Sequence, residues 1–264
     1  MLKHIELCGR TCYKSEDKIT EESCNRFVNM LREHAHGAML EHGTVYLTIP
    51  KKDIEEAVEY GKIAFDVVDE LKTIQMMRLS HLIEYPLPYS KTISCGNYVY
   101  ITTNYRVVVE NGIEFIMDKY QTEPTEHHRK RRTFKITCNR GVSHEFVRHR
   151  VFSFAQESQR YVNYSKDKFG KEIKVIKPLY FEEDSAQYYV WKFTCENAER
   201  YYMVLLNSLQ CSPQQAREVL PNSTATELIM TGFESDWEHF FDLRCAKDAH
   251  PQAQEIANMI KERF

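Results

Sequence analysis

The chain has 264 residues, of which 42% are hydrophobic and 28% are charged, and its formal net charge is −3 at pH 7. This length fits one large domain or two small ones, and the composition is ordinary for a globular protein. The mild negative charge gives no global indication of a nucleic-acid or anionic-membrane partner, and no long apolar run predicts a membrane span. Because the first residues, MLKHIELCGR, lack the apolar core of a signal peptide, we expect a cytoplasmic protein.

The N-terminal half contains patterns of both helices and strands. A helix is predicted from Thr20 to about Gly37, between an N-cap residue and a glycine stop. The alternating segment GTVYLTI, 43–49, predicts a strand, and 53–71 predicts a second helix. Residues 80–130 are less regular. There, EYPLPYSKTISCGN is typical of a loop, and YVYITTNYRVVVENG fits a strand, a helix or both.

The C-terminal half is predicted to be mostly helical. Two strands are predicted at 133–139 and 172–178. Five helices are predicted, each with a start marked by a capping residue or a proline: Ser143, Asp184 or Ser185, Ser212 with Pro213, Ser235, and Pro251. Strands separated by helices, with no repeat and no low-complexity linker, indicate an α+β fold.

The eight cysteines are scattered along the chain without a CxxC pair. Disulfide-rich domains are small and dense in cysteine, and structural zinc sites use close pairs. We therefore expect reduced thiols that pack as small hydrophobic side chains.

The segment RHRVFSFAQESQRYVNYS, 148–165, concentrates arginines and aromatic rings. Arg148, Arg150 and Arg160 each offer a fixed fork of donors that suits a phosphate. Gln156 and Ser158 offer neutral hydrogen bonds that suit a base edge or a ribose. The segment therefore predicts a site for a ligand that is both phosphorylated and planar.

Two other clusters leave alternative interpretations open. His34, His36 and His42 surround Glu41 and could form a metal-dependent hydrolase site, although their spacing is neither HxxxH nor HExxH. The basic run HHRKRR, 127–132, is most often a solvated face.

A nucleic-acid-binding protein would combine that run with 148–160 on one basic face. The net charge of −3 and the lack of a recognised nucleic-acid module count against this interpretation.

Five segments, which follow one another along the chain in the family's order, resemble the flavin-dependent thymidylate synthases. Arg148-His149-Arg150, seven residues and Ser158 match the signature RHR-x7-S, and QRY resembles its continuation. The other four segments are GRTCYKS, HGAMLEH, AREVLP and HFFDLR. The five together span nearly the whole chain.

The resemblance implies an α+β fold with a central sheet flanked by helices and a homotetramer with shared active sites. It implies one family domain over 1–264, with an extended segment at about 51–133. The implied reaction converts dUMP to dTMP, with the carbon from methylenetetrahydrofolate and a hydride that FAD obtains from NADPH. No catalytic thiol and no metal is implied, and the absence of a GxGxxG loop disfavours a Rossmann-type flavoprotein.

The resemblance also assigns residues to ligands. The implied catalytic residues are Arg244, beside the uracil, where a guanidinium stabilises negative charge, and Ser158, which we expect to position dUMP rather than attack it. The implied dUMP-binding residues are Glu145, Arg148, Gln156, Glu157, Ser158, Gln159, Arg160, Arg217 and Arg244. The implied FAD or folate contacts are His36, Ala38, Glu41, Arg148, His149, Arg150 and His239.

The chain departs from the family pattern at three places. His144-Glu145 stands where the family often has Arg-Gln, and Gln156 replaces the usual acid of the signature loop. Phe233-Glu234-Ser235 replaces Asn-Ala-Arg ahead of the last motif.

Overall fold

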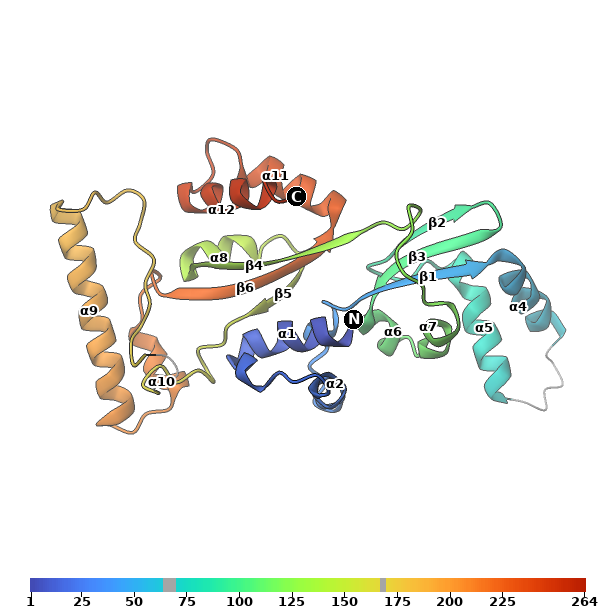
Figure 1. The fold of residues 1–264 in the computed structure, drawn as a ribbon, viewed down its shortest axis with the longest axis horizontal. Helices are drawn as coiled ribbons and strands as arrows, with labels where there is room; N and C mark the ends of the chain where they lie inside the picture. The colour runs from blue at the N-terminus through green and yellow to red at the C-terminus, as the bar shows by residue number, and fades with distance from the viewer. Residues whose placement is uncertain (64–69, 167–169) are drawn as a thin grey trace. The chain divides into compact units, whose positions relative to one another are not determined.

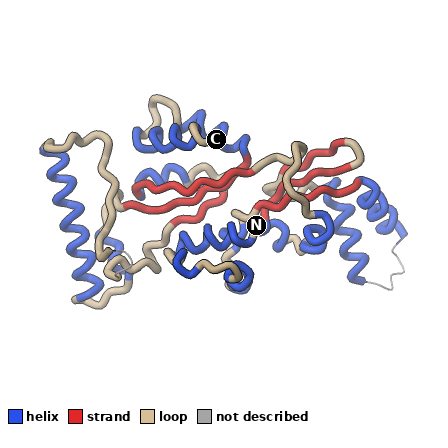
Figure 2. The backbone as a smooth tube through the Cα atoms, in the orientation of Figure 1, coloured by secondary structure: helices blue, strands red, loops and turns tan. Residues whose placement is uncertain are grey.

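The computed structural model describes residues 1–63, 70–166 and 170–264. The contacts between residues divide the chain into two compact units. The first unit consists of Met1–Glu6 and Thr20–Arg132, and the second consists of Leu7–Ile19 and Thr133–Phe264. Each unit has its own small sheet and its own helices (Figures 1 and 2). The α+β class is therefore confirmed, whereas the single family domain over 1–264 stays a prediction.

The first unit contains a three-stranded antiparallel sheet of order β1-β3-β2. Its strands are β1 (Thr44–Pro50), β2 (Lys91–Cys95) and β3 (Tyr98–Asn104). β1 confirms the strand predicted at 43–49, and its alternate side chains Val45 and Leu47 are fully buried. The loop predicted around 91–95 is wrong, because the largely exposed edge strand β2 has no apolar alternation to reveal it.

Helices surround this sheet. They are α2 (Ser23–Glu33), α3 (Gly37–Leu40), α4 (Lys51–Ile63), α5 (Glu70–Glu84), α6 (Tyr105–Glu110) and α7 (Glu114–Tyr120), and α1 (Leu2–Tyr13) begins in this unit. The helix predicted from Thr20 starts three residues later, because the hydroxyl of Ser23 accepts a hydrogen bond from the Thr20 backbone N–H at 2.9 Å. It ends at Glu33, and Gly37 begins the next helix rather than stopping this one.

Two other predictions for this unit were nearly right. α4 confirms the first part of the helix predicted at 53–71, and 64–69 lie outside the described residues. The segment YVYITTNYRVVVENG is both a strand and a helix, since β3 leads directly into α6. The change from strand to helix occurs at Asn104, whose side chain caps α6 by accepting from the Val107 N–H at 3.1 Å.

The second unit contains the sheet β4-β6-β5. Its strands are β4 (Arg131–Asn139), β5 (Ser153–Gln156) and β6 (Ala225–Phe233), and β5 runs antiparallel to β6. β4 confirms the strand predicted at 133–139. The strand predicted at 172–178 is wrong, since that segment makes only an isolated bridge between Val175 and Thr224. β5 and β6 were not predicted from the sequence, because β5 is short and β6 is buried on both faces over most of its length.

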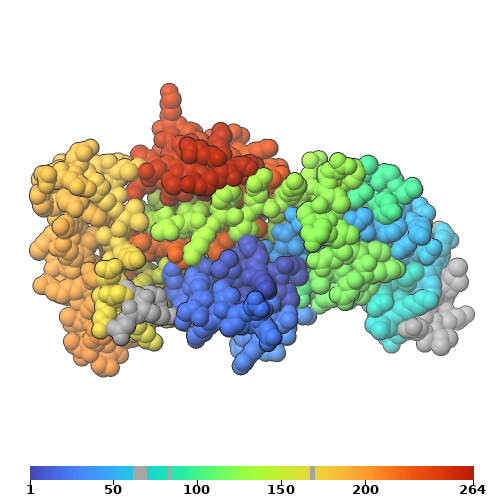
Figure 3. All heavy atoms as spheres, viewed as in Figure 1, coloured from blue at the N-terminus to red at the C-terminus, as the bar shows by residue number. Residues whose placement is uncertain are grey.

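The helices of this unit are α8 (Arg140–Phe146), α9 (Ala186–Asn207), α10 (Pro213–Ala216), α11 (Glu234–Arg244) and α12 (Pro251–Lys261), and a 3-10 turn, η4, follows α10 at Arg217–Val219. Figure 3 shows α11 and α12, in red, gathered over the green segment of β4 and α8. An aromatic cluster fills the core between them, with the rings of Phe152 and Trp237 centred 4.6 Å apart and Phe240 fully buried. Each such ring removes about 150–250 Å² from water, so this cluster fixes α11 against β6.

Helix starts were predicted with mixed success. Ser185 caps α9, Ser212 caps α10, and Pro251 begins α12, as predicted. The predicted caps Ser143 and Ser235 are wrong. Asn139 caps α8, accepting from the Val142 N–H at 2.7 Å. The cap of α11 is Phe233, two residues before Ser235, because the Asp236 carboxylate accepts from the N–H of Phe233.

Within the described ranges, no helix combines the length and the apolarity that crossing a membrane requires.

Candidate active site

The guanidinium of Arg244, at the end of α11, is held by two residues of the segment 145–149. Its Nε–H donates to Nε2 of His149 at 2.9 Å. Its two terminal nitrogens donate to the carboxylate of Glu145 at 2.7 Å and to the backbone carbonyl of Glu145 at 2.9 Å. A guanidinium has five N–H groups. Three of them are therefore used within the protein, and two remain to bind a ligand.

His149 is a neutral partner in this cluster. Its side chain is 9% exposed, and burial, with smaller contributions from Arg244 and His239, lowers the pKa of His149 from 6.5 to about 4. A protonated imidazole has no acceptor. The neutral ring accepts from Arg244 at Nε2, so its proton resides on Nδ1. His149 therefore keeps Arg244 oriented at neutral pH without adding a second positive charge.

The loop after β5 carries the rest of the signature segment and is pinned by its backbone. The N–H of Glu157 donates to the Glu227 carbonyl at 2.9 Å, and the N–H of Ser158 donates to the Cys12 carbonyl at 3.0 Å. The carboxylate of Glu157 is buried and accepts from the hydroxyl of Tyr164 at 2.6 Å. Glu157 therefore anchors the loop, and its carboxylate is already satisfied within the protein.

Lys14 ties the N-terminal segment GRTCYKS to the same loop. Its ammonium lies 2.5 Å from the Glu227 carboxylate and 3.6 Å from that of Glu157. Lys135 contacts the same carboxylate oxygen of Glu227 at 2.8 Å. Burial alone would raise the pKa of Glu227, but the two lysines hold it below its ordinary value. This ion-pair network explains physically why a basic residue follows the cysteine and tyrosine of that motif.

The signature arginines differ from these satisfied groups. Arg148, Arg150 and Arg160 are exposed, and within the described residues the first two make no hydrogen bond or ion pair. Arg160 lies over the ring of Tyr161, 5.0 Å from its centre, and donates to its hydroxyl at 3.2 Å.

Gln159 is only 8% exposed, and its side-chain Nε2 has no hydrogen-bond partner among the described residues. Buried donors normally have a partner. The loop therefore presents a cationic surface next to an unsatisfied buried amide.

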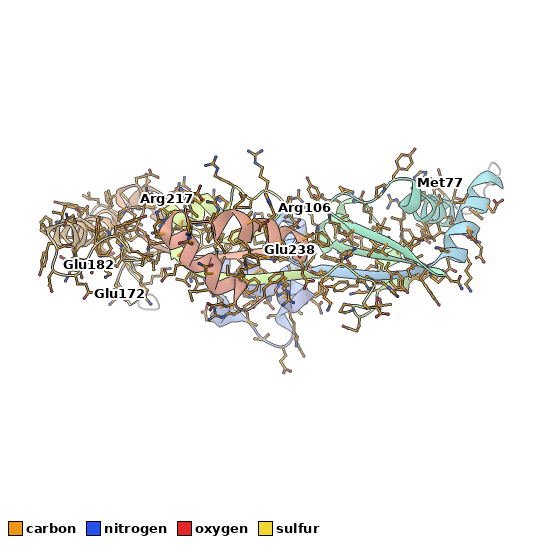
Figure 4. The ribbon with its side chains drawn as sticks, turned by 90° about the horizontal axis from the view of Figure 1, so that it is seen from above. Met77, Arg106, Glu172, Glu182, Arg217 and Glu238 are labelled. Atoms are coloured by element: carbon orange, nitrogen blue, oxygen red, sulfur yellow. The ribbon has the colours of Figure 1, made fainter. Side chains whose placement is uncertain are left out.

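Two further arginines lie near this loop. Arg217, labelled in Figure 4, begins the turn η4, and its one ion pair within the described residues is with its neighbour Glu218, at 3.4 Å. The second is Arg140, which was not predicted from the sequence and whose guanidinium donates to the Glu157 carbonyl at 3.3 Å. Burial lowers the pKa of Arg140, and the charge of Arg217 lowers it further. The asparagine cap before α8 was the signal that could have drawn attention to Arg140.

In the first unit, His36 and Ala38 are exposed at the start of α3, whereas Glu41 follows its end. The Glu41 carboxylate accepts from Arg106 at 2.7 Å, and its backbone carbonyl accepts from Arg131 at 2.9 Å. Arg106 is a residue that the sequence analysis missed, and Figure 4 labels it. The carboxylate of Glu41 is therefore paired within the protein.

The alternative interpretations gain no support from these contacts. His128 of the basic run is buried, and its ring bridges the Leu47 carbonyl and the Thr125 backbone N–H. His42 is also buried. Across the described ranges, no three His, Cys, Asp or Glu side chains are grouped so that they could hold a metal ion.

Residues 85–264 match the model of the family described as thymidylate synthase complementing protein. This match covers more than half of the chain. The chain belongs to this family. The matched part contains the complete signature, α11 and Arg217, whereas the segments GRTCYKS and HGAMLEH precede it.

The chain is also similar to proteins named flavin-dependent thymidylate synthase. It is 31% identical over 140 residues to that of Mycobacterium tuberculosis (strain ATCC 25177 / H37Ra), which covers 47% of this chain and 54% of the relative. It is 32% identical over 133 residues to that of Corynebacterium aurimucosum, which covers 45% and 51% respectively. The chain thus spans about half the length of the curated relatives it matches. The resemblance inferred from the motifs is confirmed.

The three departures from the family pattern have local explanations. Glu145 pairs with Arg244, as described above. Gln156 turns its amide toward α8 and donates to the hydroxyl of Ser143 at 2.8 Å. Phe233 is buried at the junction of β6 and α11, so its side chain contributes to packing.

Proposed function

We propose that this protein converts dUMP to dTMP, with methylenetetrahydrofolate as the carbon donor, NADPH as the reductant and FAD as the cofactor. Family membership and the relatives named flavin-dependent thymidylate synthase support a flavin-dependent enzyme of this kind. The observation that carries the proposal is the state of the signature segment. Its anchoring groups are satisfied, whereas the cations Arg148 and Arg150 are exposed and unpaired among the described residues.

These residues fit a nucleoside monophosphate. Arg148 and Arg160 would bind the phosphate, since a planar fork suits a phosphate dianion. Gln159 would satisfy its buried Nε2 on the ligand, and Arg217 would contribute a further cation. Glu157 and Gln156 are already bonded to the protein. They and Ser158 would therefore support dUMP binding by holding the loop in position.

Arg244 would bind the uracil with its two remaining N–H groups. Charge on a pyrimidine oxygen or nitrogen grows as the ring is activated, and a guanidinium fixed beforehand stabilises that charge without reorganisation. Two residues hold the Arg244 guanidinium in place. Glu145 compensates part of its charge, and His149 is a neutral acceptor. We therefore assign Glu145 a positioning role and not a phosphate contact.

The exposed residues also fit a flavin dinucleotide. Arg150 would meet its pyrophosphate, and His239 is exposed on α11. His149 has only its Nδ1–H left for a ligand. His36, Ala38 and Glu41 remain proposed flavin or folate contacts from the motif alone. When bound, FAD carries the hydride from NADPH to the new methyl group.

We also propose a central sheet flanked by helices, a homotetramer with shared active sites, and a cytoplasmic location. The family resemblance is the support for these statements.

A tritium-release assay tests the reaction. Replacement of the hydrogen at C5 of dUMP by carbon sends that hydrogen to water, so dUMP tritiated at C5 reports turnover. The assay contains the purified protein, FAD, NADPH and methylenetetrahydrofolate without oxygen. Release that requires both the folate and NADPH is expected, together with dTMP by chromatography. No release from protein that binds FAD would overturn the proposal.

A further inference from the structure

Helix α9 carries apolar side chains on two opposite faces. At about 100° per residue, one face contains Cys195, Tyr202 and Leu206, which are buried in the second unit. The opposite face exposes a stripe of five large apolar side chains, which is named here the α9 stripe: Tyr189 (55% exposed), Val190 (68%), Phe193 (67%), Tyr201 (52%) and Val204 (41%). Figures 1 and 3 show α9 at the edge of this unit.

The α9 stripe is too large and too continuous to be ordinary surface. Single exposed apolar residues are normal, but contiguous patches mark interfaces. A buried aromatic side chain covers about 150–250 Å², so three half-exposed rings and two valines present roughly 400–500 Å². A stable interface buries about 800 Å² on each partner. The stripe therefore corresponds to about half of one side of an interface between proteins.

The spacing of the stripe is symmetric about Asn197. Phe193 and Tyr201 lie four residues before and after it, and Val190 and Val204 lie seven before and after it. Two copies of α9 packed antiparallel around a two-fold axis at Asn197 would place four of the five members on a counterpart, with Tyr189 at the end of the contact. Phe193 would meet Tyr201 of the second copy, and Val190 would meet Val204 of the second copy. Self-complementarity of this kind is what a two-fold contact requires.

Asn197 itself suits the axis. Its side chain accepts from Arg200 at 2.8 Å and donates to the Phe193 carbonyl. One polar residue in an otherwise apolar helix contact specifies its register at some cost in stability. The second copy is thus indicated by the apolar area and by the symmetric spacing together.

We propose that the α9 stripe binds the α9 stripe of a second copy of this chain, antiparallel and centred on Asn197. This contact specifies one interface of the assembly proposed above. The contact rests on the proposed assembly, but its test measures only oligomeric state and cross-linking. The contact can therefore be disproved while dTMP synthesis is confirmed, and dTMP synthesis can be disproved while the contact is confirmed.

Engineered disulfides test the geometry. Helices with large residues at their contact lie about 10 Å apart, and Cα atoms lie about 2.3 Å from each axis, so facing Cα atoms are about 5.4 Å apart, within disulfide range. Asn197→Cys should give a dimer band on non-reducing gels after mild oxidation. Val190→Cys combined with Val204→Cys should do the same, and each single substitution should not. Wild-type protein controls for the native cysteines.

The two outcomes that overturn the proposal differ. A dimer band from Val190→Cys alone, absent from Asn197→Cys, excludes the antiparallel register. No cross-link from any variant excludes the contact altogether.

Substitution of the stripe tests its contribution to assembly. Phe193→Glu should at least halve the molar mass measured by light scattering, because it buries two carboxylates in the contact. Adding Tyr201→Lys should restore the larger mass, since the two positions meet only between copies. Gln187→Glu, exposed on another side of α9, is the matched control, and circular dichroism checks folding. A mass unchanged by Phe193→Glu, or a monomeric wild type that instead sediments with lipid vesicles, would overturn the proposal.

Discussion

Two segments of the chain, 127–132 and 148–160, stand out in the sequence for their arginines, and the fold uses them differently. In the first, Arg129 and Lys130 are exposed, but the fold uses Arg131 and His128 internally. Arg131 donates to the Glu41 carbonyl and to the hydroxyl of Thr44, and His128 is buried with both ring nitrogens bonded. In the second, the uncharged and acidic members hold the loop, and Arg148 and Arg150 are left exposed.

The difference shows that the density of positive charge does not identify a binding site. A donor whose hydrogen bonds are completed by the protein has little left for a ligand. A donor that the fold leaves exposed, beside a buried amide without a partner such as that of Gln159, can still bind one. The following predictions test this distinction, from the largest expected effect to the smallest.

Arg244→Ala should have the largest effect. Loss of one preorganised donor costs about 10²–10³ in rate, and this substitution removes two proposed ligand donors, so we expect a fall in kcat/KM of at least about 10³-fold in tritium release. Arg244→Lys should recover little, because an ammonium lacks the fork. Circular dichroism should be unchanged. Turnover within a few-fold of wild type would refute the proposed role.

His149 should make stability depend on pH. Its pKa is about 4 in the folded protein and 6.5 ordinarily. Between these values the unfolded chain takes up a proton that the folded protein does not, so the free energy of unfolding falls as the pH falls from 6.5 to 4. The shift corresponds to at most about 3 kcal/mol.

The measurement is denaturant unfolding at pH 7 and pH 5, for the wild type and for His149→Gln, which cannot titrate. The wild type should lose more stability than the variant. An equal loss in both would show that His149 does not contribute.

Arg148→Ala should weaken dUMP binding by about 10- to 100-fold, since a hydrogen bond to a charged group contributes about 1.5–3 kcal/mol. Arg129→Ala, an exposed arginine of the other segment, is the matched control and should leave the affinity unchanged. Calorimetric titration measures both. Equal losses in the two variants would show that binding follows general charge, as the nucleic-acid alternative requires.

Arg131→Met should lower stability without changing dUMP binding. We expect the free energy of unfolding to fall by about 1–2 kcal/mol, because the backbone of Glu41 and the hydroxyl of Thr44 lose a charged donor. The affinity for dUMP should not change. Denaturant unfolding checks the first expectation, and a weakened affinity at full stability would remove the distinction between the two segments.

Much of the local structure could be predicted from the sequence, and the failures have physical causes. Ser185, Ser212 and Pro251 mark helix starts by chemistry that acts within one turn. The strands β5 and β6 were missed, because a short strand and one buried on both faces have no period of two.

The same limit applies to the candidate site. The signature predicted which residues belong to the candidate site. It did not predict that the carboxylate of Glu157 is already paired with Tyr164 and Lys14. It also gave no indication of Arg140, whose contact with Glu157 depends on how α8 leaves β4.

The sequence alone determined the family, the spacing from Arg148 to Ser158 and the presence of arginines suited to phosphate, since these depend on residue types at fixed separations. Only the tertiary structure decided which of those arginines are available. Arg244 meets His149 and Glu145 across separations of 95 and 99 residues, because α8 and α11 pack against the same strand, β6. Contacts at such separations follow from the packing of whole elements, which no local pattern specifies.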